Sequence, residues 1–267
     1  MIRAGRPEEL PVRWVSYKPG EVMPEPTHRS ILVVDVENSE SLTNVQVDAV
    51  RTALYRIIDG AIEGVESSVA QEDRGDGAML VLDIPVLDVL DRVVGAMLTG
   101  VREHNGAVGP VNWLRVRIAV HEGYVGRDAK GWSSDAVTAT FRMNSAQPVK
   151  YALERAPRAD AVVVVSDSVF CGLVRHGYRD TVIPDEYGSV TVPSKSGDRL
   201  IWVRVPGYPA PPLPPSEAPA PAHAEYRAVG SDTAPPGWER STIHATNFIG
   251  GNAVVGTQVG RDNISRG

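Results

Sequence analysis

The first strong pattern in the chain is a run of β-branched and apolar residues, Ile31 to Val34, which ends in the carboxylate of Asp35. Such a run is typical of a buried strand. A second strand signal, Ala78 to Leu82, is separated from the apolar segment Val65 to Ala70 by a Gly-Asp-Gly turn centred on Asp76. This arrangement predicts a hairpin. If the hairpin lies beside the first strand, the two aspartates converge at one end of a sheet.

Helical spacing follows each of these elements. Apolar residues between Val47 and Ile62 recur at three- and four-residue intervals and predict a helix with one apolar face, preceded by N-cap candidates between Ser39 and Asn44. The pattern returns from Val86 to Val101 and should break at Asn105-Gly106. The first half of the chain is therefore expected to run strand, helix, hairpin, helix.

Strand and helix signals alternate less regularly in the second half. A strand with alternating polar and apolar residues should be ended by Gly123, and a helix should be capped by Ser134 or Asp135. The expected strands are 112–122, 161–165, 189–193 and 200–205, and the expected helices are 135–153 and 166–175. The absence of strict βαβ alternation favours an α+β sheet with helices on one face.

Composition divides the 267-residue chain into four expected parts. Residues 1–27 are a poorly ordered leader, able to donate an edge segment around 12–17, and 28–207 form the folded domain. Residues 208–240 are an extended proline-rich linker, and 241–267 are a β-prone tail. The net charge of −6 argues against a nucleic-acid-coating surface, and Cys171 is the only cysteine. No run is apolar enough for a signal peptide or a membrane span, so a cytoplasmic protein without a membrane or nucleic-acid partner is expected.

Two carboxylates fixed at one sheet edge form a site for hard divalent cations. For either residue alone, an ordinary role is the better interpretation: Asp76 supplies turn chemistry and Asp35 ends a strand. His121 and Glu122 are adjacent strand residues that point to opposite faces, so they are not expected to act as an acid-base pair.

From Ile31 to Val205 the chain resembles the catalytic domain of class III nucleotide cyclases. Val33-Val34-Asp35-Val36 and Arg74-Gly75-Asp76 resemble the two metal motifs of this family, Arg117 to Val125 is similar to its strand-to-glycine pattern, and Ser134 to Met143 to the start of its substrate-binding helix. The resemblance implies a ferredoxin-like α+β fold with a mixed, mainly antiparallel sheet. It also implies conversion of a nucleoside triphosphate into a 3′,5′-cyclic nucleotide and pyrophosphate, with two Mg²⁺ or Mn²⁺ ions, in a homodimer with composite sites.

By this resemblance the metal ligands are Asp35 and Asp76, and the carbonyl of Val36 also binds metal. Arg142 corresponds to the arginine that stabilises charge on the phosphates in the transition state. Thr138 stands where the family has an asparagine, so the amide that orients the ribose is lost.

Three further positions carry over less directly. Lys195 has the setting of a phosphate-binding lysine after a shift of about one residue, and Gly75 is grouped with the substrate-binding residues. Glu72 stands at the base-selecting position, where a carboxylate accepts from guanine N1 and N2 hydrogens. Its usual partner position falls near Lys130 or Gly131 and matches neither the adenylate nor the guanylate class. A pyrimidine substrate therefore stays open beside guanine.

The tail has a resemblance of its own. Residues 255–264, with Gln258 followed by an apolar residue, glycine and Asn263, resemble amyloid-signalling motifs related to the RIP homotypic interaction motif. Thr257 replaces the first apolar position of that motif. This pattern suits stacking into cross-β structure and implies a partner that carries a like motif, whereas composition alone also allows a disordered tail or a small docked hairpin.

Two functions follow from these patterns. The first is a homodimeric cyclase in a bacterial signalling or defence pathway, with metal ligands from one chain and Arg142, Glu72 and Lys195 from the other. The second is a catalytically inactive nucleotide sensor or scaffold that assembles through its tail. Thr138 favours the second function, and the presence of both aspartates favours the first.

Overall fold

The computed structural model describes residues 25–65, 68–109, 112–128, 131–193 and 197–215, together with the strand residues 248–249 and 252–253. The chain divides into two units, Met1–Glu217 and Ala218–Gly267. The first contains the sheet described next, and the second contains the short antiparallel pair β9 (Phe248–Ile249) and β10 (Asn252–Ala253). The boundaries expected from composition stay predictions.

The described residues of the first unit build an eight-stranded sheet with the order β2-β3-β1-β4-β6-β8-β7, and β5 pairs with β4 outside this path. The strands are β1 (Thr27–Val36), β2 (Val69–Asp73), β3 (Gly77–Leu82), β4 (Val116–Asp128), β5 (Gly131–Ser133), β6 (Ala161–Ser166), β7 (Tyr187–Val192) and β8 (Arg199–Arg204). Only the β4–β6 pair is parallel among these strand pairs. The expected α+β fold with a mixed, mainly antiparallel sheet is confirmed.

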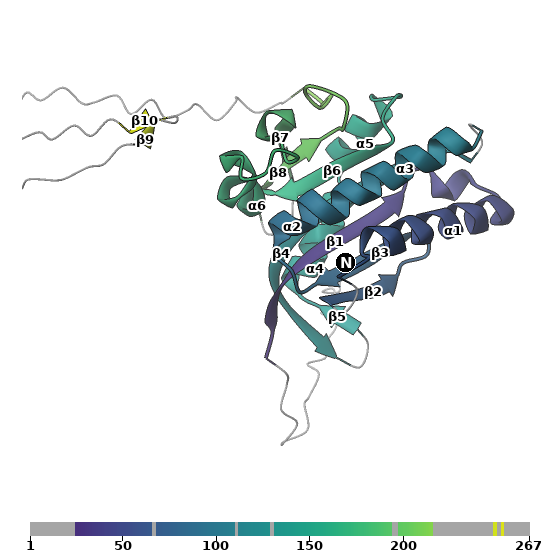
Figure 1. Cartoon of the computed structure of the whole chain (residues 1–267), viewed down its shortest axis with the longest axis horizontal. Helices are drawn as coiled ribbons and strands as arrows, with labels where there is room; N and C mark the ends of the chain where they lie inside the picture. The colour runs from purple at the N-terminus through teal and green to yellow at the C-terminus, as the bar shows by residue number, and fades with distance from the viewer. Residues whose placement is uncertain are drawn as a thin grey trace, which may run out of the picture. The chain divides into compact units, whose positions relative to one another are not determined.

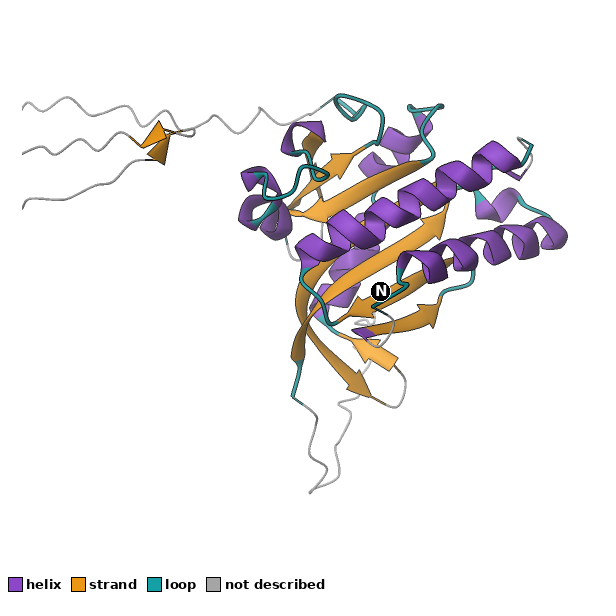
Figure 2. Ribbon diagram, in the orientation of Figure 1, coloured by secondary structure: helices purple, strands orange, loops and turns teal. Residues whose placement is uncertain are grey.

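The helices lie on both faces of this sheet (Figures 1 and 2). They are α1 (Asn44–Ala61), α2 (Val86–Asp88), the π-type segment η3 (Val89–Val94), α3 (Gly95–Ala107), α4 (Asp135–Asn144), α5 (Gln147–Glu154) and α6 (Asp167–Gly172). Short 3₁₀ segments are η1 (Ser39–Ser41), η5 (Val174–His176) and η6 (Pro184–Glu186).

Each face of the sheet has its own core. Leu54 of α1 and Met97 of α3 pack in one core with Leu32 and Ile118 of the strands. On the opposite face α4 and α5 cover the strands, where Val137 packs with Ile31 and Val33. The expectation of helices on one face only is wrong. The central strands β3 and β6 are buried at every position, and a strand that is apolar on both sides needs cover on both sides.

Several expected boundaries differ from the structure, and local contacts explain three of them. The helix that ends with α3 continues through Asn105 and Gly106, because the Asn105 side chain is buried and exchanges hydrogen bonds of 2.8 and 2.9 Å with the backbone of Leu114. The expected helix 135–153 is two helices, since Pro148 at the start of α5 has no N–H for a continuous helix. Strand β4 does not end at Gly123, which pairs with Arg29 of β1.

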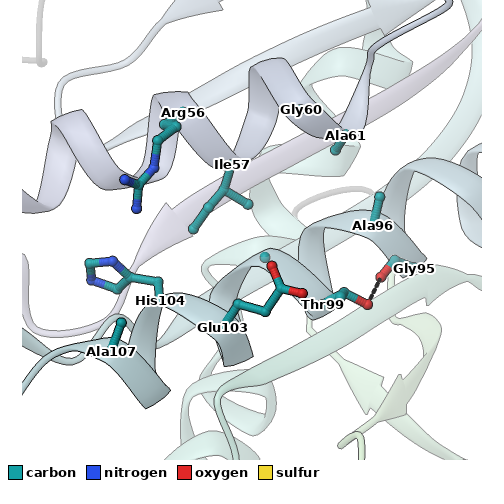
Figure 3. Close-up of a pocket in the computed structure, with 11 residues that line it drawn as sticks. Arg56, Ile57, Gly60, Ala61, Gly95, Ala96, Thr99, Glu103, His104 and Ala107 are labelled. Atoms are coloured by element: carbon teal, nitrogen blue, oxygen red, sulfur yellow. Dashed lines mark hydrogen bonds between the residues drawn. The ribbon is translucent and has the colours of Figure 1, made fainter.

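The start of α1 is fixed by a capping box between Thr43 and Gln46, within the stretch where an N-cap was expected. Farther along, α1 approaches α3 closely: a Cβ at Gly100 would lie 3.0 Å from Ile57. Beside this contact is a cavity of about 550 Å³ between the two helices, bordered by Arg56, Glu103 and His104 (Figure 3). It contains none of the expected site residues.

Among the described residues no helix combines the length and apolar character needed to cross a membrane. The expected edge segment 12–17, Lys195 and the motif-like segment 255–264 all lie outside the described residues.

Candidate functional site

Asp35 and Asp76 lie at the same edge of the sheet. Strands β1 and β3 are antiparallel neighbours with Asp35 opposite Gly77, the residue that follows Asp76. The N–H of Val36 donates to the carbonyl of Asp76 at 3.1 Å, which ties the turn to the end of β1. The predicted convergence of the two aspartates is therefore present in the chain.

The glycine after Asp76 is required by this close approach. A Cβ at Gly77 would lie 2.2 Å from the carbonyl oxygen of Val34, a distance that no side chain tolerates. Gly77 consequently lets β3 begin directly against β1, and it brings the preceding aspartate next to Asp35.

Arg117 of β4 holds the Asp35 carboxylate from the other side. Its Nη2 donates to Oδ2 at 3.0 Å, and its Nε lies 2.8 Å from Oδ1 without the alignment of a hydrogen bond. Burial raises the pKa of Asp35 above its ordinary value, opposed by Arg117 and by a hydrogen bond with Asn144, whereas the nearby charge of Asp76 raises it further. The repulsion between two partly buried carboxylates is the condition that a bound cation relieves.

The side chain of Asp76 points to the loop after β1. Ser39 of η1 donates its hydroxyl to Oδ2 of Asp76. This loop turns at Asn38, whose φ of 56° is left-handed, a conformation that asparagine adopts more readily than most residues. Asp76, Ser39 and Arg117 border a cavity of about 780 Å³ that reaches Lys150 on α5.

The residues present suit a divalent cation, although they do not enclose it. Oδ1 of Asp35 is buried and accepts no hydrogen bond. Within the described ranges no group of three or more His, Cys, Asp or Glu side chains is arranged for a metal. Two carboxylates that leave the remaining positions to water and phosphate oxygens are the usual protein share of a magnesium site in phosphoryl transfer.

Glu72 lies at a different place, on β2. Its Oε1 accepts from the N–H of Trp132 at 3.1 Å, and its Oε2 accepts from Arg74 at 2.7 Å. Arg74 also lies over the ring of Phe141 on α4, with 5.1 Å from Cζ to the ring centroid. The Glu72 carboxylate also lies against Gly131, where a Cβ would be 2.7 Å from Oε1. The position expected to select the base and one of its expected partner positions are therefore neighbours in the folded structure.

Thr138 and Arg142 are one turn apart on α4, and both are exposed. Ser134 caps this helix, since its hydroxyl accepts from the N–H of Val137 at 3.0 Å. The Thr138 hydroxyl donates to the carbonyl of Ser134 at 3.1 Å and is thus used within its own helix. Neither Thr138 nor Arg142 borders the cavity beside Asp76, and neither does Glu72.

The backbone N–H and carbonyl of Gly75 both form hydrogen bonds within the protein. Its N–H donates to Asp73 at 2.8 Å, and its carbonyl accepts from Arg51. Gly75 has a φ of +83°, a left-handed conformation that glycine adopts without strain.

Arg117, Ser39 and Asn144 were not singled out from the sequence. In the sequence Arg117 belongs to a strand motif without an assigned site role, because its partner Asp35 is 82 positions away in the chain. Strand order was the missing information: once β4 is known to pair with β1, Arg117 and Asp35 stand opposite each other in the register.

No profile of a known protein family matches the sequence, and no curated protein matches it. Solved structures do. A crystal structure of an adenylate/guanylate cyclase/hydrolase from Silicibacter pomeroyi matches 69% of this chain and 100% of its own with a TM-score of 0.50 and 20% identity.

The catalytic core of a rhodopsin-guanylyl cyclase with converted specificity, in complex with ATPαS, matches with a TM-score of 0.46 and 17% identity over 69% of this chain and 98% of its own. A bacterial light-regulated adenylyl cyclase matches with a TM-score of 0.46 and 15% identity over 69% of this chain and 54% of its own. At these identities the likeness concerns the fold: like the Silicibacter structure, the first unit has the fold of an adenylate/guanylate cyclase core.

Proposed function

We propose that the first unit is a metal-dependent nucleotide cyclase that converts a nucleoside triphosphate into a 3′,5′-cyclic nucleotide and pyrophosphate. The observation that carries this proposal is the convergence of Asp35 and Asp76 at one sheet edge, beside a polar cavity that Arg117 also borders. The cyclase-like fold of the first unit supports it.

The reaction is an intramolecular displacement. The ribose 3′ hydroxyl releases its proton to water and its oxygen attacks the α-phosphorus. The bond from that phosphorus to the bridging oxygen breaks, and pyrophosphate leaves. Asp35, Asp76 and the carbonyl of Val36 would hold Mg²⁺ or Mn²⁺, which supplies a lowered pKa at the 3′ hydroxyl and neutralises phosphate charge. Arg117 places a further cation beside the cavity, and Arg142 is the candidate for stabilising charge in the transition state.

A composite site in a homodimer accounts for the separation of these groups. Thr138, Arg142 and Glu72 do not border the cavity beside Asp76. Thr138 and Arg142 are exposed on α4, so a second copy of the chain can present them, together with Glu72 and Lys195, to the metal-binding half. Each dimer would then hold two sites.

Glu72 favours guanine as the base, since a carboxylate accepts from the N1 and N2 hydrogens. The two oxygens of Glu72 already accept hydrogen bonds from Trp132 and Arg74. A bound base would compete with these hydrogen bonds or would contact Arg74 instead of Glu72. Pyrimidine triphosphates therefore belong in the assay beside guanine.

The proposal is tested by incubating the full chain with Mn²⁺ and each of the four ribonucleoside triphosphates, followed by mass spectrometry of the products. One triphosphate should yield its cyclic monophosphate and pyrophosphate in equal amounts. Recovery of all four substrates unchanged at high enzyme concentration would sink the proposal.

A second candidate function is a nucleotide sensor or scaffold without turnover. The Thr138 hydroxyl takes the place of the expected asparagine amide, and it donates its hydrogen bond to the carbonyl of Ser134. This proton is therefore not available to a ribose. Saturable nucleotide binding without product in the same assay would favour this function.

We further propose that the protein is a cytoplasmic effector in a bacterial signalling or defence pathway. In this proposal the proline-rich linker connects the catalytic unit to the tail, and the tail recruits a partner with a like amyloid motif. The Gln258 and Asn263 pattern supports this.

A further inference from the structure

The turn that carries Asp76 is exposed and built around a glycine. Arg74 and Gly75 are both exposed, and Gly75 has the left-handed φ of +83°. A glycine turn at the end of a strand pair is free to move unless other groups fix it. If Asp76 binds a cation together with Asp35, its carboxylate must be held in place, because a bound ion such as Mg²⁺ accepts only a small range of ligand positions.

Helix α1 supplies that fixation through Arg51. Its Nη1 and Nη2 lie 3.0 and 2.6 Å from the two carboxylate oxygens of Asp73, at the end of β2. The same Nη1 also donates to the carbonyl of Gly75, and Asp73 in turn accepts from the N–H of Gly75 at 2.8 Å. The guanidinium of Arg51 therefore binds both the Asp73 carboxylate at the end of β2 and the carbonyl of Gly75, immediately before Asp76.

Tyr55, one helical turn beyond Arg51, contacts Gly77, the residue that follows Asp76. Its hydroxyl donates to the carbonyl of Gly77 at 3.3 Å, and Arg51 lies over its ring at 5.5 Å. The hydrogen bonds from Arg51 hold the pKa of the Asp73 carboxyl well below its usual range, so the pair stays charged throughout the neutral range. We call Arg51, Tyr55 and Asp73 the turn clamp.

The turn clamp is anchored on α1, which is itself held in place by the core. Between Arg51 and Tyr55 on α1, Ala53 and Leu54 are buried in the core, and the capping box fixes the first turn. Movement of the turn relative to α1 would break a two-pronged ion pair and two backbone contacts together. Movement of α1 would disturb the core.

From these contacts we propose that Arg51 is a positioning residue that holds Asp76 in register with Asp35 for cation binding. The proposal rests on the proposed function. Arg51 acts through backbone and through Asp73 and touches neither the substrate nor the reacting atoms. Its contribution to folding stability is small, since an exposed ion pair adds little, whereas loss of groups that orient a metal ligand lowers affinity or activity about 10- to 100-fold.

The first test compares Arg51→Ala, Arg51→Lys and Arg56→Ala in the full-length protein. Arg56 is an exposed arginine on the same helix that borders the cavity between α1 and α3, so it matches the change in charge and side-chain length away from the turn. Arg51→Ala should raise the Mn²⁺ concentration for half-maximal activity about tenfold or more, with a smaller change in KM for the triphosphate at saturating metal. Arg51→Lys should restore part of the loss, because one ammonium cannot make the paired contacts.

The second test does not depend on activity. Backbone ¹⁵N order parameters of Arg74, Gly75 and Asp76 should fall from about 0.85 toward 0.6 in Arg51→Ala and stay near the wild-type values in Arg56→Ala. Equal order parameters in the two variants, or equal Mn²⁺ dependence, would overturn the positioning role. An inactive wild-type protein would contradict the proposed function instead, and the order parameters would still decide whether Arg51 holds the turn.

Discussion

Arg117 and Asp35 form a two-point ion pair across neighbouring strands, with 3.0 Å from Nη2 to Oδ2 and 2.8 Å from Nε to Oδ1. The side chains are only 12% and 23% exposed. Burial raises the pKa of Asp35, and Arg117 opposes this effect beside the cavity proposed for the triphosphate.

Removal of Arg117 should therefore destabilise the fold. Arg117→Ala leaves Asp35 buried without its counter-charge, and we expect the free energy of unfolding in urea to fall by about 3 kcal/mol. Arg29→Ala is the matched control, because its pair with Asp83 is more exposed, at 25% and 64%, and should contribute less than about 1 kcal/mol. Equal losses in the two variants would contradict the importance of burial for this pair.

The local elements of the fold could be predicted because their causes are local. The apolar runs of β1, β3 and β6, the spacing of α1 and the glycine turn at Asp76 are all visible within a few residues. The break before α5 also has a local cause, since Pro148 cannot continue a hydrogen-bonded helix. The apolar periodicity nevertheless runs across this proline and by itself predicts one helix.

The rest of the site depends on which strands become neighbours. Asn105 looked like a helix breaker, yet it forms hydrogen bonds with Leu114 and Asp160 after the chain has folded back. Likewise, the partners of Glu72 are Trp132, 60 positions later, and Arg74, only two positions later. Hydrophobic periodicity indicates which face of a strand or helix a residue occupies. It does not indicate which residue of another element will lie opposite.

Asp76→Asn should abolish turnover while leaving the fold intact. The amide keeps the shape and accepts from Ser39, but it lacks the charge for a divalent cation, so activity should fall at least about 100-fold. Stability should change by less than about 1 kcal/mol, since the turn is not part of the core. Asp83→Asn, a substitution just beyond the other end of β3, is the control and should retain activity. Normal cyclase activity in Asp76→Asn with an unchanged melting curve would remove the metal-site assignment.

Complementation tests the composite site. Inactive Asp76→Asn and inactive Arg142→Ala chains should regain activity when mixed, because each heterodimer then contains one site with both halves intact. Random exchange of equal amounts makes half of the dimers mixed, so about a quarter of wild-type activity is expected. Subunit exchange is followed independently by native mass spectrometry of one isotope-labelled partner. If exchange is complete and activity does not return, each chain carries a self-contained site.

His121 should make stability depend on pH. Burial, with Arg199 and His28 nearby, lowers the pKa of His121 from 6.5 to about 4, and its Nδ1 lies 2.8 Å from Ser166 Oγ. The folded state therefore favours the neutral ring, and between these two pKa values the unfolded state binds more protons. The resulting stabilisation is complete above pH 6.5 and is lost as the pH falls toward 4.

His121→Gln removes this titration and keeps a polar partner for Ser166. Between pH 7 and pH 4.5 the wild type should lose about 2 kcal/mol more stability than the variant, measured by urea unfolding at each pH. Other titrating groups contribute to both proteins and cancel in the comparison. Parallel stability curves across this window would show that His121 is not held neutral.

The tail prediction rests on a β-prone, nearly uncharged segment after a proline-rich stretch. A peptide of residues 241–267 should assemble into cross-β fibres, because in-register stacking pairs each backbone group and ladders Gln258 and Asn263 along the fibre. Gln258→Asp should prevent assembly, since it stacks like charges at strand spacing of about 4.8 Å. Asp262→Asn is the matched control in the same peptide, and it should assemble at least as readily because it removes a stacked charge. Fibres are identified by thioflavin fluorescence and a cross-β diffraction pattern, and a wild-type peptide that stays monomeric at high concentration would make the segment an ordinary terminus.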